Sequence, residues 1–254
     1  MIDGVTVLRG DCRVSLRYLP ECSVDAVITD PPYGQTSLPW DRFPYGWMAE
    51  VSRVLKPTGS VWVFGNLRMF TEHWREFDGW KLAQDIVWEK HNGSSFHADR
   101  FRRVHEQAAQ FYRGDWGSVY KGRVVTMDAK ARTVRKKSGP QQHMGRLAQE
   151  TTYVSEDGGP RIMRSVIYAR SEHGRAVHPT QKPAAIIAPL IQNACPPGGV
   201  VLDPFAGSGT TGGVASWLGR KAILCEAHDE YLSLMPERIA ALSNAPRDLF
   251  GDHA

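Results

Sequence analysis

The sequence has no long apolar run, few cysteines and no familiar metal-binding pattern. No stretch approaches the roughly twenty apolar residues that a membrane-spanning helix needs, so we expect no membrane contact. The first residues, "MIDGVTVLRGD", lack the basic-then-apolar layout of a secretory signal, which favours a cytoplasmic protein. The four cysteines form no Cys-x-x-Cys pair, and the nine histidines form no His-Glu-x-x-His pattern. We therefore expect reduced thiols and no metal site.

The charge of the chain is small but unevenly distributed. The net charge over 254 residues is +4. Residues 91–175 hold sixteen Lys and Arg against eight Asp and Glu, which gives +8; the rest holds fifteen against nineteen, which gives −4. A basic middle segment on a mildly acidic body suggests a polyanionic partner. A solvated loop region with scattered arginines is the alternative interpretation.

Short apolar runs alternate with helical patterns in the two outer parts of the chain. This alternation predicts a mostly parallel sheet covered on both faces by helices. From residue 113 to 178 the pattern fails, and a polar, basic sequence with brief apolar runs predicts a partly irregular insertion. The predicted strands are 5–8, 24–29, 60–64, 84–90, 106–112 and 221–226; the predicted helices are 12–19, 45–55, 67–76, 182–195 and 229–243; a strand, a Gly-rich loop and a helix are predicted within 198–219.

The stretch "TDPPYGQT" (29–36) follows a buried strand directly. Asp30 is therefore predicted just beyond the carboxyl end of that strand, where open α/β sheets bind ligands. Pro31 and Pro32 fix two φ angles, so the carboxylate and the ring of Tyr33 are held on a stiff backbone. The alternative is a Pro-Pro turn in which Asp30 is merely solvated.

The stretch "VLDPFAGSGTT" (201–211) is the second informative one. Its strand leads to Asp203, and glycines then open a helix, where backbone can approach a ligand closely. A carboxylate at this place can hold an ammonium group. Glu226 ends the next strand, where an acid can accept both hydroxyls of a ribose. An amino acid joined to a nucleoside, such as S-adenosylmethionine, fits both acids.

With these residues the chain resembles the amino-methyltransferases of DNA. The matching motifs are "DPPYG" (30–34), "HPTQKP" (178–183) and "DPFAGSGTT" (203–211). Their order resembles that of the β class, a circular permutation of the usual methyltransferase order. The resemblance implies an α/β, Rossmann-like fold that depends on S-adenosylmethionine, with a mostly parallel sheet and one antiparallel strand. It also implies a catalytic half at 1–112, an inserted target-recognition region at 113–177 and a cofactor-binding half at 178–254.

The resemblance assigns catalysis to the Asp-Pro-Pro-Tyr element, that is Asp30, Pro31, Pro32 and Tyr33. The lone pair of an exocyclic amine on a base is delocalised into the ring and is a poor nucleophile. The carboxylate of Asp30 and the carbonyl of Pro31 are expected to accept the two amino hydrogens, and Tyr33 is expected to stack on the base. Because the base must leave the duplex to reach them, base flipping is implied.

The resemblance also implies a cofactor site. Asp11 and Cys12 are expected near the adenine of the cofactor, Glu226 at its ribose, Asp203 at its ammonium and Lys182 at its carboxylate. For Lys182 a solvated lysine at a helix start is the alternative, and for Cys12 we favour a backbone contact. His105 and Glu106 are expected to be structural. The full set of expected cofactor-binding residues is Asp11, Cys12, Asp30, Pro31, Thr180, Lys182, Asp203, Phe205, Gly207, Ser208, Gly209, Thr210 and Glu226.

The resemblance therefore predicts a site-specific DNA methyltransferase that acts on adenine N6. Asp30 favours adenine, because relatives that methylate cytosine N4 usually have Ser before Pro-Pro-Tyr; that reaction is the alternative. Enzymes that methylate RNA or a protein glutamine place the cofactor loop before the Pro-Pro-Tyr element, which is opposite to the order here. A DNA-binding regulator with an inactive methyltransferase fold is disfavoured, because Asp30, Asp203 and Glu226 are intact. The expected partners are double-stranded DNA, a second copy of the chain and a cognate restriction endonuclease. The run "KARTVRKK" (130–137) is either a phosphate-contacting strip or a solvated loop.

Overall fold

The computed structural model describes residues 4–94, 98–136, 138–141, 145–147, 150–171 and 181–246. It divides into two compact units: the chain up to Gly122 together with the chain from Arg164 onward, and the segment Arg123–Met163. The predicted insertion, 113–177, is longer at both ends than this smaller unit. Residues 113–122 and 164–171 pack with the larger unit, and 172–177 lie outside the described residues. The assignment of 113–177 to target recognition stays a prediction.

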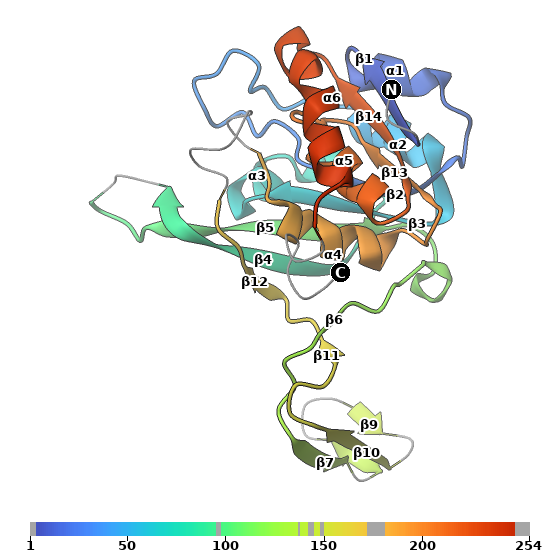
Figure 1. The fold of residues 1–254 in the computed structure, drawn as a ribbon, viewed down its shortest axis with the longest axis vertical. Coiled ribbons are helices and arrows are strands. Elements are labelled where there is room, and N and C mark those ends of the chain that lie inside the picture. The colour runs from blue at the N-terminus through green and yellow to red at the C-terminus, as the bar shows by residue number, and fades with distance from the viewer. Residues whose placement is uncertain are drawn as a thin grey trace. The chain divides into compact units, whose positions relative to one another are not determined.

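An eight-stranded sheet forms the centre of the larger unit (Figure 1). All neighbouring strands are parallel except where β5 pairs antiparallel with β3 and with β4. The predicted mostly parallel sheet with one antiparallel strand is thus confirmed. In spatial order the strands are β1 (Val5–Arg9), β14 (Lys221–Glu226), β13 (Val200–Asp203), β2 (Val24–Thr29), β3 (Leu55–Gly65), β5 (Arg103–Tyr112), β4 (Lys81–Ser94) and β12 (Val166–Tyr168).

Helices cover both faces of this sheet. Successive side chains of a strand point to opposite faces, so a strand that is apolar throughout needs a covering layer on each side. Val61 and Val63 of β3 belong to the same apolar cluster as Trp47 and Val51 of α2. Phe64, on the opposite face, lines a small cavity together with α4, which contacts α5. The helices are α1 (Cys12–Ser15), α2 (Trp47–Val54), α3 (Leu67–Glu72), α4 (Ala184–Ala194), α5 (Thr210–Trp217) and α6 (Asp229–Ser243).

Three elements differ from the sequence-based expectation. The predicted helices at 12–19 and 67–76 are each a short α-helix followed by a 3₁₀ turn, at Leu16–Tyr18 and Trp74–Phe77. The apolar run "VIY" within the predicted irregular segment joins the main sheet as β12, with Ile167 buried against it. The predicted helix at 229–243 is present in full as α6, which is continuous through Pro236.

The smaller unit consists of antiparallel strand pairs. β6 (Val125–Thr126) pairs with β11 (Arg161–Ile162), β7 (Arg132–Lys136) with β10 (Thr151–Ser155), and β8 (Gly139–Gln141) with β9 (Gly145–Leu147). Arg161 forms an ion pair with Asp128, with 2.6 Å between Nη2 and Oδ2. Within the basic run at 130–137, residues 132–136 form strand β7, and the charged side chains of this strand are exposed. Lys137 lies outside the described residues.

Among the helices that the structure describes, none is long and apolar enough to cross a membrane.

Candidate active site

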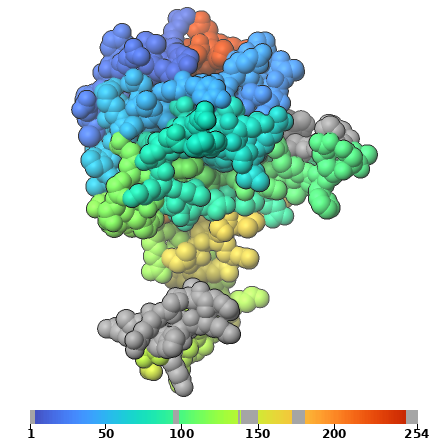
Figure 2. Space-filling view, turned by 180° about the vertical axis from the view of Figure 1, so that it is seen from behind, coloured from blue at the N-terminus to red at the C-terminus, as the bar shows by residue number. Residues whose placement is uncertain are grey.

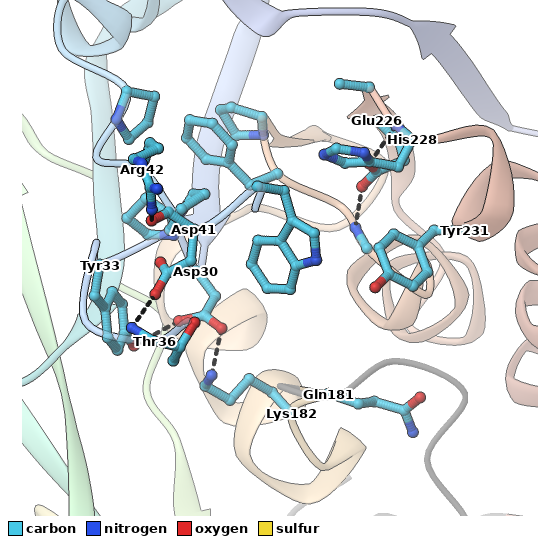
Figure 3. A pocket seen from close by; sticks show the side chains of 18 of the residues that line it. Asp30, Tyr33, Thr36, Asp41, Arg42, Gln181, Lys182, Glu226, His228 and Tyr231 are labelled. Atoms are coloured by element: carbon cyan, nitrogen blue, oxygen red, sulfur yellow. Dashed lines mark hydrogen bonds and ion pairs between the residues drawn. The ribbon is translucent and has the colours of Figure 1, made fainter. Parts of the chain in front are cut away.

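The carboxyl ends of the central strands border a cavity of about 1160 Å³ (Figure 3). Such a volume exceeds that of an ordinary small-molecule pocket, which is roughly 300–1,000 Å³. The cavity brings together many residues that the sequence assigned to chemistry or cofactor binding. These are Asp11, Cys12, Asp30, Pro31, Pro32, Tyr33, Lys182, Phe205, Gly207 and Glu226.

Asp30 follows β2 directly, and its carboxylate lies between two side chains (Figure 3). The hydroxyl of Tyr33 donates a hydrogen bond of 2.6 Å to Oδ1, and the ammonium of Lys182 contacts Oδ2. Burial raises the pKa of Asp30 above its ordinary value, and the charge of Lys182 partly offsets that effect. The acid and the ring are thus held together at the strand end, as the sequence predicted.

Lys182 belongs to a buried group of two ammonium ions and two carboxylates. Besides Asp30 it faces Glu106, with 3.3 Å between Nζ and Oε2, and Lys90 contacts the other oxygen of Glu106. Burial opposes the charge of Glu106, but Lys182 and Lys90 outweigh it and lower its pKa to about 2. The sequence placed Lys182 at the cofactor carboxylate and gave Glu106 a structural role. Neither the pairing of Lys182 with Asp30 nor the part of Lys90 could be inferred from spacing.

Asp41 fixes the loop that follows Tyr33. Its buried carboxylate accepts three backbone N–H groups, from Gly34 at 2.8 Å, Gln35 at 2.9 Å and Thr36 at 2.6 Å. Burial would raise the pKa of Asp41, but these hydrogen bonds lower it. An acid inside the loop "SLPWDRF" matches no motif, so no sequence pattern indicated this role.

Asp203 ends β13, and its buried carboxylate accepts three hydrogen bonds from the protein. Its Oδ1 accepts hydrogen bonds from the hydroxyl of Thr29 at 2.8 Å and from the N–H of Phe205 at 3.1 Å. The hydroxyl of Thr211 donates to Oδ2 at 2.7 Å. Burial nevertheless raises the pKa of Asp203 to about 6. Asp203, Ser208 and Thr210 line a separate cavity of about 50 Å³, beside Asp30 and Lys182.

Glu226 ends β14 and organises the glycine loop. Its Oε2 accepts the N–H of Gly207, and its Oε1 accepts the N–H of His228, each at 2.8 Å (Figure 3). Gly207, with φ of 51°, and Gly209, with φ of 78°, both have left-handed backbone, which residues with a Cβ rarely adopt. A carboxylate has about four acceptor sites, so these two bonds do not exhaust the capacity of Glu226.

Four predicted residues remain: Asp11, Cys12, Gly209 and Thr180. Asp11 caps α1 through the N–H of Arg13 at 2.9 Å and also forms an ion pair with that side chain. Cys12 is buried, and burial raises the pKa of its thiol. Gly209 is the N-cap of α5 and lines neither cavity. Thr180 lies outside the described residues.

Several aromatic residues that we did not predict line the main cavity. The rings of Trp40 and His228 lie 6.3 Å apart, and those of His228 and Tyr231 lie 6.1 Å apart. Trp40 and Tyr231 lie in no motif that the sequence analysis singled out, so no sequence pattern pointed to this wall. Within the described ranges, no cluster of three or more His, Cys, Asp or Glu residues could hold a metal ion.

Comparisons with known proteins agree on one family. A family model described as DNA methylase matches residues 24–237. The Type II methyltransferase M.HinfI of Haemophilus influenzae is 30% identical over 276 residues, which cover 96% of this chain and 70% of that protein.

Two solved structures are similar over most of their length. The M1.HpyAVI–SAM complex has a TM-score of 0.62 and 25% identity, covering 92% of this chain and 98% of that chain. The PvuII DNA methyltransferase, described as cytosine-N4-specific, has a TM-score of 0.66 and 20% identity, covering 99% of this chain and 94% of that one. At that identity the second similarity establishes the fold only.

Proposed function

Since this chain belongs to the DNA methylase family, whose members transfer a methyl group from S-adenosylmethionine, we propose that its substrate is the N6 amino group of adenine in duplex DNA. The observation that carries the choice of base is Asp30. A carboxylate stands where relatives that act on cytosine usually have a serine, and it is buried beside a cavity large enough for a cofactor and a base.

The residues of this chain suit the reaction. Asp30 and the carbonyl of Pro31 accept the two amino hydrogens, which localises the nitrogen lone pair and removes the need for reorientation during the reaction. Tyr33 presents its ring to the base while its hydroxyl holds Asp30. When bound, S-adenosylmethionine supplies an electrophilic methyl group. The amine must then lose one proton, and the raised pKa of Asp30 makes this carboxylate a suitable acceptor.

The residues that line the main cavity also suit the binding of S-adenosylmethionine. Glu226 uses one lone pair of each oxygen on a backbone N–H, and the others remain for the two ribose hydroxyls. Trp40, His228 and Tyr231 offer aromatic faces for an adenine, beside Asp11 and Cys12. In this proposal Asp203 holds the ammonium group across the small cavity, and Lys182 is shared between Asp30 and the cofactor carboxylate.

Double-stranded DNA is the proposed partner, and the unit Arg123–Met163 is the proposed reader of its sequence. This unit holds eight basic and four acidic residues, a net charge of +4, which favours contact with phosphates. We also propose that the working unit is a homodimer, because two copies suit a palindromic site. A cognate restriction endonuclease and a cytoplasmic location complete the proposal.

The test identifies the methylated nucleoside directly. The protein is incubated with labelled S-adenosylmethionine and genomic DNA, RNA or protein, and the digested DNA is analysed by mass spectrometry for modified nucleosides. We expect label in DNA alone, as N6-methyladenine, at sites that sequencing can map. N4-methylcytosine would contradict the choice of base, and label in RNA or protein would contradict the substrate class.

A further inference from the structure

The antiparallel pair β4 and β5 forms a long hairpin whose base borders the main cavity. Trp88, Lys90 and Gly93 on β4, and Glu106 on β5, line the cavity. Figure 1 shows this hairpin reaching beyond the neighbouring strands, and Figure 2 shows its end projecting from the body of the larger unit. The described residues at that end are 98–102, directly before β5 begins. The hairpin therefore carries its tip outward from the wall of the candidate active site.

Phe101, at this tip, has a side chain that is 99% exposed. Folding leaves the apolar surface of this ring in water, so it is available to a partner. Its neighbours Arg100, Arg102 and Arg103 are basic, and Asp99 is the one acid nearby in sequence, so residues 99–103 carry three positive charges and one negative, a net +2. An apolar ring among arginines matches a partner that offers flat apolar faces and phosphates, which is a stacked nucleic acid.

The tip is also linked to the reacting residues. The side chain of Arg102 lies against Gly93, where an added Cβ would meet Cγ of Arg102 at 2.4 Å. Gly93 lines the cavity, so this arginine stands at its border. Arg103 is the first residue of β5, three residues before Glu106, which lines the cavity.

We propose that Phe101 enters the DNA base stack beside the target base and fills the space that the flipped base leaves. Extruding a base costs a few kcal/mol of pairing and stacking, and an aromatic ring that stacks on the remaining bases recovers about 1–3 kcal/mol of it. Arg102 and Arg103 then contact the phosphates on either side of the gap. The role extends the proposed function: it rests on methylation of a base in duplex DNA and is the same for adenine and for cytosine.

The experiment compares Phe101→Ala with wild type on two duplexes that carry the mapped methylation site. The first duplex is fully paired, and the second has an abasic position opposite the target base, so that the cost of breaking the pair is already removed. On the paired duplex we expect kcat/KM to fall about tenfold or more, as ~1.4 kcal/mol of lost stacking implies. On the abasic duplex we expect kcat/KM within about threefold of wild type.

Two further variants control for general damage. Phe101→Trp keeps a stacking ring and should restore methylation of the paired duplex. Tyr18→Ala removes another exposed aromatic side chain, 84% exposed and outside the cavity lining, and should leave both rates unchanged. Binding of S-adenosylmethionine, measured by calorimetry, should be the same in wild type and Phe101→Ala.

Four results would overturn the inference. Equal losses on the two duplexes would mean that Phe101 does not act on base extrusion, and no loss on either would mean that it has no role. A lower mass of Phe101→Ala in light scattering would identify the ring as a contact between two copies of the chain. A wild-type protein that methylates neither duplex would contradict the family activity instead, and this inference with it.

Discussion

The carboxylate of Asp30 binds protein side chains in the structure, but the proposed reaction requires it to bind the substrate amine. In the structure its carboxylate accepts the Tyr33 hydroxyl and contacts the Lys182 ammonium. In the reaction it must accept hydrogens from a substrate amine. The hydrogen bond from Tyr33 and the ion pair with Lys182 therefore hold the carboxylate in place, and one of them has to yield when the base enters.

We expect Asp30→Ala to reduce methyl transfer by more than about a hundredfold, because an acceptor needed in the transition state is lost. The affinity for S-adenosylmethionine should change much less, since Glu226 and the aromatic wall remain. Single-turnover rates on cognate DNA and calorimetric titration with the cofactor measure the two effects. Near-normal turnover by a folded Asp30→Ala protein would sink the proposed mechanism.

The raised pKa of Asp203 predicts a pH dependence of cofactor binding. The neutral acid cannot pair with an ammonium, so affinity for S-adenosylmethionine should reach its plateau well above the pKa of about 6 and fall as the pH drops through that value. At pH 7, Asp203→Asn should weaken binding by roughly 1.5–3 kcal/mol, the value of a charge-assisted contact, and should flatten the profile. Calorimetry between pH 5 and 7 measures both.

Asp229→Asn is the matched control for this profile, because Asp229 is an exposed acid paired with Arg9 at the surface. It should keep the affinity and the pH dependence of wild type. A profile that is equally steep in Asp203→Asn would mean that another acid, such as Asp30, controls the titration.

Three elements meet at the buried charge group. Lys90 belongs to β4, Glu106 to β5, and Lys182 stands just before α4. Glu106 therefore ties the hairpin to the segment that carries Lys182, and through Lys182 to Asp30. Because these charges lie in a poorly solvated place, removing one member leaves the others uncompensated.

We expect Glu106→Gln to lower the free energy of unfolding by about 3 kcal/mol at neutral pH. The pKa of Glu106 falls from an ordinary 4.5 to about 2 on folding, so its contribution is complete above pH 4.5 and is lost as pH falls toward 2. The variant should lack this part of the acid sensitivity. Chemical denaturation at several pH values measures the difference.

Glu72→Gln serves as the control at the surface. Glu72 pairs with Arg68 on α3 at 2.7 Å, with both side chains well exposed. Such pairs contribute roughly 0–1 kcal/mol, so stability should hardly change. If the two substitutions lowered the free energy of unfolding equally, the charges around Glu106 would be solvated and would contribute little to stability.

At the scale of the molecule, the division into two compact units suggests a division of labour. The larger unit contains the cavity and all the described residues proposed for catalysis and cofactor binding. We expect that exchanging residues 123–163 for the equivalent segment of a relative transfers the target sequence while methyl transfer continues. Sequencing of methylated DNA gives the result. Unchanged target sites in the chimaera would assign recognition to the larger unit.

The homodimer is tested by light scattering at working concentration, with and without cognate DNA. We expect twice the mass of one chain in both conditions, because a small catalytic domain has limited surface for a DNA site. The mass of a single chain in both would contradict the dimer and would favour separate visits to the two strands.

The sequence by itself determined the family, the fold class and the three motif regions. Apolar periodicity is a local property, and the rigid "DPPYG" and "DPFAGSGTT" segments are contiguous, so strand ends with an acid could be recognised without a structure. Asp30, Asp203 and Glu226 were therefore found, each directly after or at the end of its predicted strand. The short edge strand β12 was missed, because three apolar residues in a basic segment carry too little pattern.

Only the tertiary structure decided which charges face one another. Lys90, Glu106 and Lys182 are distant in sequence. The pairing of Lys90 with Glu106 follows from the antiparallel register of β4 with β5, and the pairing of Lys182 with Glu106 and Asp30 follows from the place where α4 packs. The same holds for Asp41, whose carboxylate accepts N–H groups of a loop that no propensity predicts. Long-range contacts of polar groups depend on the packing of whole elements, and a sequence pattern reports only the element that contains it.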